Sequence, residues 1–222
     1  MAPVALVVVL LSAANALAFR PGIAGSWQFW AFLAVPYVLA AGFGMYRMWE
    51  EGTLTERITP RWGDISIGVI TVGALLVASW VARSAMAPAG TPQQAWLFRI
   101  YLQVGNTDAL QKSSALTALL LGIPVLEELV WRGYVLGELE RRVGNRRGWM
   151  LATLLYAVTL LPTAYTLRDP VAGLNPLLPV AALGAGMVWS FEASLLKRLA
   201  PVALSHMAFT YFSAVQFHWP GM

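Results

Sequence analysis

Seven apolar stretches follow one another along the chain, each close to the ~20 residues that a helix needs to cross a bilayer. They run approximately over residues 3–19, 26–48, 65–87, 114–137, 148–167, 176–196 and 199–218. Only a few residues around Lys197-Arg198 join the last two, so we expect one of them to be tilted or not fully spanning. The pattern predicts an all-α fold, a polytopic transmembrane helical bundle of about seven helices (six to eight) that forms a single membrane-embedded domain over residues 1–222.

The first stretch has two interpretations. Val4 to Leu11 resembles the apolar region of a signal peptide, with Ala16-Leu17-Ala18 as its cleavage site. The basic segment that normally precedes such a region is missing here. We therefore favour a retained helix over a cleaved signal.

The stretch 88–113 is polar enough to predict a loop between the third and fourth apolar stretches. It contains Trp96, Phe98 and Tyr101. Aromatic side chains of this kind collect at membrane–water interfaces, so we expect part of the loop to lie there.

Composition supports the membrane interpretation. Hydrophobic residues make up 58% of the chain and charged residues only 12%, against roughly 25% charged in soluble domains. The mean hydropathy of +0.63 also argues against an ordinary soluble core and makes the lipid bilayer the expected surroundings. Because cysteine is absent, disulfides, thiolate chemistry, iron–sulfur ligation and palmitoylation are excluded. We ascribe the net charge of +4 to membrane topology and expect no nucleic-acid partner.

The basic residues predict the orientation of the chain. Of the fifteen, Arg132 lies within a predicted span, and five fall on one side of the spans, at Arg20, Arg83, Arg99, Lys112 and Arg168. The other side carries nine, at Arg47, Arg57, Arg61, Arg141, Arg142, Arg146, Arg147, Lys197 and Arg198. Positive charge is retained on the cytoplasmic side of membranes, so the side with nine should be cytoplasmic, with the N-terminus inside. We expect a multi-pass protein of a bacterial inner (plasma) membrane.

Three charged residues interrupt the fourth apolar stretch, in the run Glu127-Glu128-Leu129-Val130-Trp131-Arg132-Gly133-Tyr134. An ionisable group at that depth costs at least ~2.5 kcal/mol. Glu128 and Arg132 are four residues apart with the acid first, which is the favourable geometry for an ion pair on one helix face. Glu127 lies on a neighbouring face and has no partner on its own helix. An intramembrane acid of this kind indicates a functional site.

A structural interpretation stands beside the functional one, because an ion-pair cluster can serve helix packing alone. His206, in Ser205-His206-Met207-Ala208-Phe209-Thr210, is the other strongly titratable group at membrane depth in the C-terminal half. A single hydrogen-bonded histidine in a helix is also common. In the chemical interpretation, a desolvated carboxylate accepts a proton from water near neutral pH, and nearby donors stabilise the oxyanion that follows.

Two regions of the chain resemble the CPBP (Abi) family, which contains the CAAX prenyl endopeptidases and bacterial bacteriocin-processing and immunity proteins. Glu-Glu-x-x-x-Arg followed by Gly133 on a membrane helix resembles the family's first motif. The run from Gly184 to Thr210 resembles its last conserved region, in which a glycine-rich helix leads to a leucine-proline segment, here Leu199-Ala200-Pro201, and then to a histidine, here His206. The resemblance covers roughly residues 114–212, which would form the catalytic core.

The resemblance implies a glutamic-type intramembrane endopeptidase. Glu127 would match the general base that activates water, and Glu128 with Arg132 would match the supporting acid and its partner. His206 would match a histidine that helps to stabilise the oxyanion. The family requires no metal, and we expect no cofactor. The chain has only His206 and His218 and no His-Glu-x-x-His, which excludes a conventional zinc site.

Two positions depart from the family pattern. The second motif pairs an aromatic residue with a histidine four places later, but here Tyr156 is followed by Leu160, which can donate no hydrogen bond. The last motif usually ends in Asn or Asp, where this chain has Thr210. Loss of one oxyanion donor costs ~10²–10³ in turnover. We therefore consider Tyr156, Thr159 and Thr210 as substitute oxyanion donors or supports.

The preferred function is a CAAX-protease-like intramembrane endopeptidase that cleaves a membrane-associated protein or peptide. The alternative is a catalytically impaired homologue that acts as a binding, maturation or immunity factor, which the loss of the histidine at Leu160 favours. A remote alternative is a proton-coupled transporter that uses Glu127, although the chain shows no internal repeat and no paired broken helices. The sequence sets neither the substrate nor the oligomeric state, and resemblance to CAAX proteases does not imply prenylated substrates.

Overall fold

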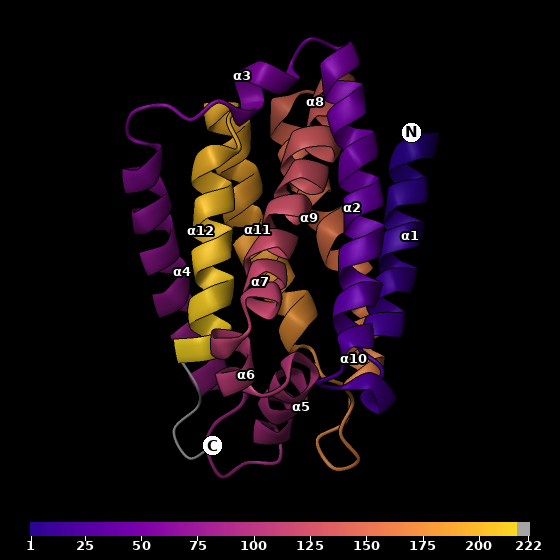
Figure 1. The fold of residues 1–222 in the computed structure, drawn as a ribbon, viewed down its shortest axis with the longest axis vertical. Coiled ribbons are helices and arrows are strands. Elements are labelled where there is room, and N and C mark those ends of the chain that lie inside the picture. Colours follow the sequence, from indigo (N-terminus) through magenta and orange to yellow (C-terminus); the bar gives the residue numbers. More distant parts are fainter. Residues whose placement is uncertain (217–222) are drawn as a thin grey trace.

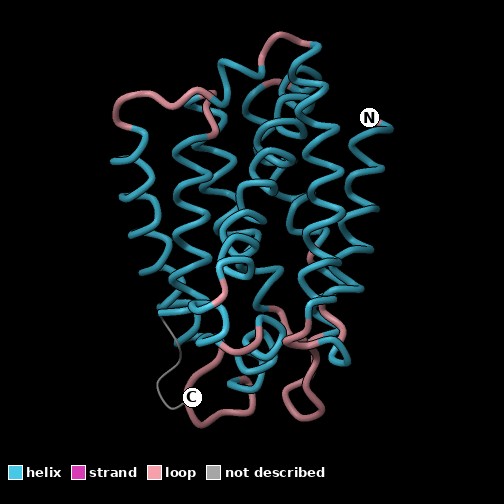
Figure 2. Tube along the Cα trace, viewed as in Figure 1, coloured by secondary structure: helices cyan, strands magenta, loops and turns pink. Residues whose placement is uncertain are grey.

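The computed structural model describes residues 1–216, which fold into a bundle of long helices joined by short helices and connections (Figures 1 and 2). The only β-type pairing within these residues is an isolated bridge between Asp169 and Gly173. The predicted all-α bundle is confirmed. The helices are α1 (Ala2–Ala18), η1 (Pro21–Ile23), α2 (Trp27–Glu50), α3 (Leu54–Ile58), α4 (Asp64–Met86), α5 (Gln94–Val104), α6 (Thr107–Lys112), α7 (Ser114–Glu128), η2 (Leu129–Val135), α8 (Leu136–Val143), α9 (Asn145–Thr159), α10 (Leu161–Thr166), α11 (Leu177–Leu196), α12 (Ala200–Tyr211) and η3 (Phe212–Gln216).

Each predicted apolar stretch corresponds to a helix or to consecutive helices of the bundle. The fourth comprises α7, η2 and α8, the fifth comprises α9 and α10, and the described part of the seventh comprises α12 and η3. Within residues 1–216, five helices are long and apolar enough to cross a membrane: Trp27–Glu50, Asp64–Met86, Ser114–Val143, Asn145–Thr166 and Leu177–Leu196. The chain is therefore a multi-pass integral membrane protein. The apolar helix α1 is shorter than these five.

Helix α1 is built into the bundle beside α2, α9 and α10. Its inward face buries an apolar row that includes Val4, Val7 and Leu11. Near its C-terminal end the buried Asn15 donates its Nδ2 hydrogen to the carbonyl oxygen of Thr159, at 2.9 Å. This bond ties α1 to the end of α9, the helix that carries Tyr156.

The predicted loop at 88–113 is wrong in part, because most of it is helical. It contains α5 and α6, which lie together at the lower end of the bundle in Figure 1. The side chain of Asn106 accepts hydrogen bonds from the backbone N–H groups of Asp108 and Ala109, which caps α6. Helices this short lack the long apolar run by which the spanning segments were recognised.

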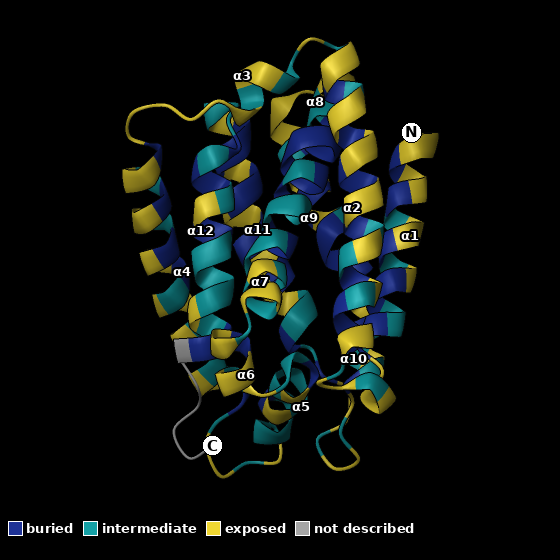
Figure 3. Cartoon of the chain, in the orientation of Figure 1, coloured by how far each residue is buried: buried dark blue, intermediate teal, exposed yellow. Residues whose placement is uncertain are grey.

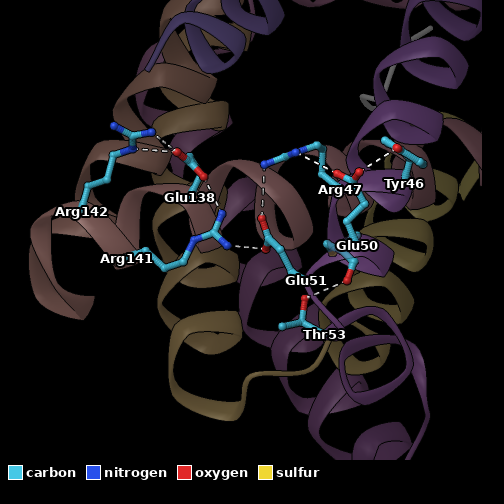
Figure 4. A network of polar contacts seen from close by, with 9 residues as sticks. Tyr46, Arg47, Glu50, Glu51, Thr53, Glu138, Arg141 and Arg142 are labelled. Atoms are coloured by element: carbon cyan, nitrogen blue, oxygen red, sulfur yellow. Dashed lines mark hydrogen bonds and ion pairs between the residues drawn. The ribbon is translucent and has the colours of Figure 1, made fainter.

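Positive charge gathers at the end of the bundle where α3 and α8 lie, at the top of Figure 1. The nine basic residues expected on one side all fall on helix ends and connections at this end. Some of them form the network in Figure 4, in which Arg141 contacts both Glu51 and Glu138. Arg142 pairs with the same Glu138 at 2.5 Å. The network joins the C-terminal end of α2 to α8.

Burial is deepest at η2, where six consecutive residues from Val130 to Val135 are buried. By contrast, α4 packs mainly on α12 and is exposed along much of its length, as the yellow segments in Figure 3 show. Outward-facing side chains such as Ile65, Val69 and Ile70 are more than 60% exposed, as expected for a lipid-facing surface. The centre of the bundle is therefore where α7, η2, α9, α11 and α12 meet.

Candidate active site

The acidic motif lies at a change of helix type. Helix α7 ends at Glu128, and the next seven residues form the π-helix η2 before α8 resumes the α-helical pattern. At the end of η2 the backbone N–H of Leu136 donates to the carbonyl oxygen of Trp131, five residues back. Single π-turns inside α-helices are rare and occur frequently at functional sites. This turn sets the positions of Glu127, Glu128 and Arg132 relative to one another.

Glu128 and Arg132 form the predicted ion pair, with Arg132 NH1 3.1 Å from Glu128 Oε1. Both side chains are sealed from solvent, with exposed fractions of 1% and 0%. The same carboxylate oxygen lies 2.7 Å from Nδ1 of His206 on α12. Glu128 therefore joins the first conserved region to the last one through a single oxygen atom.

Glu127 finds its partners on other helices. The hydroxyl of Tyr156 on α9 donates to Glu127 Oε2 at 2.8 Å. Nε2 of His206 stands 3.9 Å from the same oxygen, which is too long for a direct hydrogen bond. The Glu127 side chain keeps 17% of its surface exposed, against 1% for Glu128. Of the two acids, Glu127 is the one that a water molecule can reach.

Arg132 is enclosed by residues from two further helices. Its NH2 group donates to the carbonyl oxygen of Gly186 on α11 at 3.3 Å. Its guanidinium carbon lies 4.6 Å from the centre of the Tyr156 ring and 5.5 Å from that of Trp189, within the range of cation–π attraction. A Cβ atom on Gly186 would stand 3.0 Å from Tyr156 Cδ1 and 3.2 Å from Arg132 NH2. The absence of a side chain at Gly186 is what allows Arg132 and Tyr156 to occupy their places.

The imidazole of His206 is held by an aromatic partner that sequence reasoning missed. The rings of Trp189 and His206 stack with their centres 3.9 Å apart and their planes 26° from parallel. Trp189 Nε1 donates to the hydroxyl of Ser205 at 3.0 Å, and Ser205 donates in turn to the carbonyl oxygen of Val202. These contacts orient Trp189 and restrict rotation of the imidazole.

The substitute donors considered from sequence are placed differently from one another. Tyr156 points at Glu127, as described above. Thr159 is fully buried, and its hydroxyl donates to the carbonyl oxygen of Tyr156 within its own helix at 2.7 Å. Thr210 lies one turn after His206 on α12 and makes no side-chain hydrogen bond within residues 1–216. Leu160 follows the last residue of α9 as its C-cap and packs against the apolar core.

A second residue that the sequence did not mark lies outside both conserved regions. Arg57 on α3 donates from NH1 to the carbonyl oxygen of Arg132 at 3.2 Å. Its own carbonyl oxygen accepts a hydrogen bond from the backbone N–H of Leu199, which caps α12, at 2.9 Å. Arg57 was counted only as one of the basic residues that indicate orientation. Nothing in its local sequence signals a contact with residues 75 positions away.

The part of the chain that the structure describes holds no group of three or more His, Cys, Asp or Glu side chains arranged to bind a metal ion. His218, the second histidine, lies outside the described residues. Glu128, Arg132 and His206 form one hydrogen-bonded cluster, and Glu127 lies at its edge.

One comparison with known proteins gives a match over the region that contains Glu127, Glu128, Arg132 and His206. The model of a family described as type II CAAX prenyl endopeptidase Rce1-like matches residues 109–212. This match confirms the resemblance to the CPBP family over roughly residues 114–212. Neither the curated proteins nor the solved structures contain a match to the chain.

Proposed function

From the premise that residues 109–212 carry the sequence pattern of the Rce1-like endopeptidase family, we propose that the chain is an intramembrane peptide hydrolase. Its substrate would be a membrane-associated protein or peptide, and the attacking group would be a water molecule activated by Glu127. The observation that carries the proposal is the contrast between the two neighbouring acids. Glu128 is sealed in an ion pair, while Glu127 is partly accessible and lies near a histidine.

The proposed reaction begins with proton transfer from water to the Glu127 carboxylate, as the resulting hydroxide attacks the carbonyl carbon of the scissile peptide bond. The tetrahedral intermediate carries its negative charge on the former carbonyl oxygen. Glu127 then returns the proton to the leaving nitrogen as the carbon–nitrogen bond breaks. The products are a new carboxyl terminus and a new amino terminus, so one water molecule is consumed and Glu127 is regenerated.

Two polar groups near Oε2 of Glu127 support this chemistry. The Tyr156 hydroxyl holds Oε2 of Glu127 and limits its rotation. His206 faces the same oxygen through Nε2, while its Nδ1 is bound to Glu128. If Nδ1 carries the proton that Glu128 accepts, Nε2 can donate to an oxyanion only when the imidazole is positively charged.

A single isosteric substitution tests the proposal. Glu127→Gln keeps the size of the side chain and removes its ability to take a proton. Terminal-peptide proteomics would compare membrane and secreted fractions of cells carrying wild-type protein or the variant at equal abundance. We expect new peptide termini that depend on wild-type protein and disappear with Glu127→Gln.

Glu192→Gln supplies the matched control for this experiment. Glu192 is also a buried acid of a spanning helix, but it accepts its hydrogen bond from Thr71 on α4, at 3.0 Å, and makes no hydrogen bond to the described residues of the site. Its substitution should leave the new termini in place. Termini that persist with Glu127→Gln would contradict a role for Glu127 as the base.

A second candidate function is a noncatalytic homologue that captures a peptide or lipid chain, and Leu160 favours it. This residue is the C-cap of α9, its apolar side chain packs against the core, and it offers no donor where the family has a histidine. A phenotype that survives Glu127→Gln but is lost in Glu128→Gln would support this candidate. Loss of the phenotype in Glu127→Gln would support the hydrolase.

A further inference from the structure

Arg57 takes part in a closed ring of contacts that passes through both conserved regions. Its side chain binds the carbonyl oxygen of Arg132, whose guanidinium binds Glu128. Glu128 binds His206 on α12, and the residue that caps α12, Leu199, donates its backbone N–H back to the carbonyl oxygen of Arg57. The ring therefore starts and ends at one residue of the short helix α3.

The two hydrogen bonds of Arg57 act on different parts of the site. The bond to Arg132 reaches the π-helix η2, where the backbone departs from regular α-helical hydrogen bonding and an added donor stabilises the local geometry. The bond from Leu199 positions the start of α12, two turns before His206. Together they set the separation between the helix that carries Glu128 and the helix that carries His206.

The surroundings of Arg57 hold its guanidinium in this position. Gly137 on α8 leaves room for it, because a Cβ atom there would lie 3.1 Å from Arg57 NH2. Burial of the guanidinium lowers the pKa of Arg57. Glu140 and Glu51 attract the guanidinium and offset part of this effect. These residues line a cavity of about 250 Å³ at the basic end of the bundle.

We propose that Arg57 is a positioning residue of the active site, which holds Arg132 and α12 in the register that lets Glu128 bind His206. The inference deepens the proposed function and rests on it only for its effect on turnover. Arg57 lies outside residues 109–212, so a segment that the family match does not cover contributes to the geometry of the site. The connection between α2 and α4 is then part of the catalytic apparatus and not merely a loop.

The state of the His206 ring tests the proposal without reference to proteolysis. The chain has only two histidines, so ¹⁵N-histidine labelling gives few signals, and His206→Gln assigns them. In the wild-type protein we expect Nδ1 of His206 to carry a proton, because it faces the Glu128 carboxylate. In Arg57→Met the Nδ1 signal should move toward the mixture of tautomers that an unconstrained imidazole adopts. Turnover should fall about tenfold, as for loss of one charge-assisted hydrogen bond.

Three further variants sharpen the test. Arg57→Lys keeps a cationic donor and should restore part of the wild-type signal and rate. Gly137→Ala keeps every charge but crowds the guanidinium, so it should shift the signal in the same direction by a smaller amount, even if Arg57→Met fails to fold. Arg61→Met removes a cation from the same connection, and Arg61 makes no side-chain hydrogen bond to either conserved region among the described residues. It should leave the signal unchanged.

Unchanged His206 signals in folded Arg57→Met and Gly137→Ala would overturn the positioning role. A shift equal in Arg61→Met and Arg57→Met would also overturn it, because the effect would then come from net charge. If the signals respond to Arg57 while wild-type protein generates no new peptide termini, the positioning role stands and the hydrolase proposal fails. The two inferences are thereby distinguished.

Discussion

At the scale of single residues, one contact of the site comes from the aromatic position of the second motif. Tyr156 occupies the aromatic position of the second motif, and its hydroxyl donates to Glu127 at 2.8 Å. A phenylalanine at this place would leave that oxygen of Glu127 without its donor. The hydroxyl thus supplies a hydrogen bond to the site in a chain where Leu160 stands at the histidine position and offers none.

Tyr156→Phe should therefore lower turnover by about 10- to 100-fold, because hydrogen bonds to charged groups contribute about 1.5–3 kcal/mol. The ring still packs against Arg132 and Trp131, so the melting temperature in detergent should change little. Tyr165→Phe is the control, because Tyr165 is 60% exposed and contacts Arg168 instead of the site. Equal turnover in the wild type and Tyr156→Phe would refute the assigned role.

A second prediction at this scale compares loss of the sealed Arg132 cation with loss of the partly accessible Glu127 charge. Arg132→Ala leaves Glu128 in the core without its cation, and breaking a buried pair in this way costs about 3–5 kcal/mol. Glu127→Gln removes a charge that is partly accessible and should cost much less. Thermal unfolding in detergent would compare the two variants, and equal melting temperatures would contradict the difference in burial.

At the scale of elements, the site depends on the close approach of α11 to α9 and η2. Gly186 lies at this contact, where a Cβ atom would crowd Tyr156 and Arg132 at 3.0 and 3.2 Å and would require them to shift. The short π-helix η2 serves the same end, because it places Arg132 where the Gly186 carbonyl can accept from it. Helix geometry and the absence of one side chain together position the cation of the site.

Gly186→Ala should destabilise the fold by about 1–3 kcal/mol, the usual cost of overpacking, and should lower turnover by displacing Tyr156. Gly184→Ala is the matched control on the same helix, since a Cβ atom there would meet no atom within 4 Å. Both variants change the helix propensity of α11 equally. Melting temperature and turnover measured side by side should separate them, and identical behaviour would contradict the packing argument.

At the scale of the whole molecule, charge is distributed unevenly between the two ends of the bundle. The helix ends and connections near α3 and α8 carry the nine basic residues, and five lie at the opposite end. We propose that the end with nine faces the cytoplasm, with the N-terminus on the same side. The salt-bridge network between α2 and α8 would then lie at the cytoplasmic surface (Figure 4).

The absence of cysteine makes this orientation simple to test, because each introduced cysteine would be the only one. Arg146→Cys lies at the basic end, and Ala89→Cys lies in the connection after α4 at the other end. Both positions are exposed. In intact cells a membrane-impermeant maleimide should label Ala89→Cys and should label Arg146→Cys only after the membrane is opened. The reverse labelling pattern would show that the end with nine basic residues faces away from the cytoplasm and would refute the proposed orientation.

The sequence by itself determined the features that depend on near neighbours in the chain. Apolar runs of sufficient length predicted the helices of the bundle, because a bilayer allows few other structures. The spacing of four predicted the ion pair between Glu128 and Arg132, because residues i and i+4 share a helix face. The short helices α5 and α6 escaped prediction, since neither has a long apolar run.

Only the tertiary structure decided which distant groups complete the site. Tyr156 reaches Glu127 across 29 positions of the chain, and His206 reaches Glu128 across 78. Arg57 reaches Arg132 across 75. No local periodicity encodes such contacts, because they follow from how whole helices pack, from the π-turn in η2 and from the space left at Gly186. The sequence therefore marked the charged residues that need a buried partner, and packing of the bundle determined which partners they have.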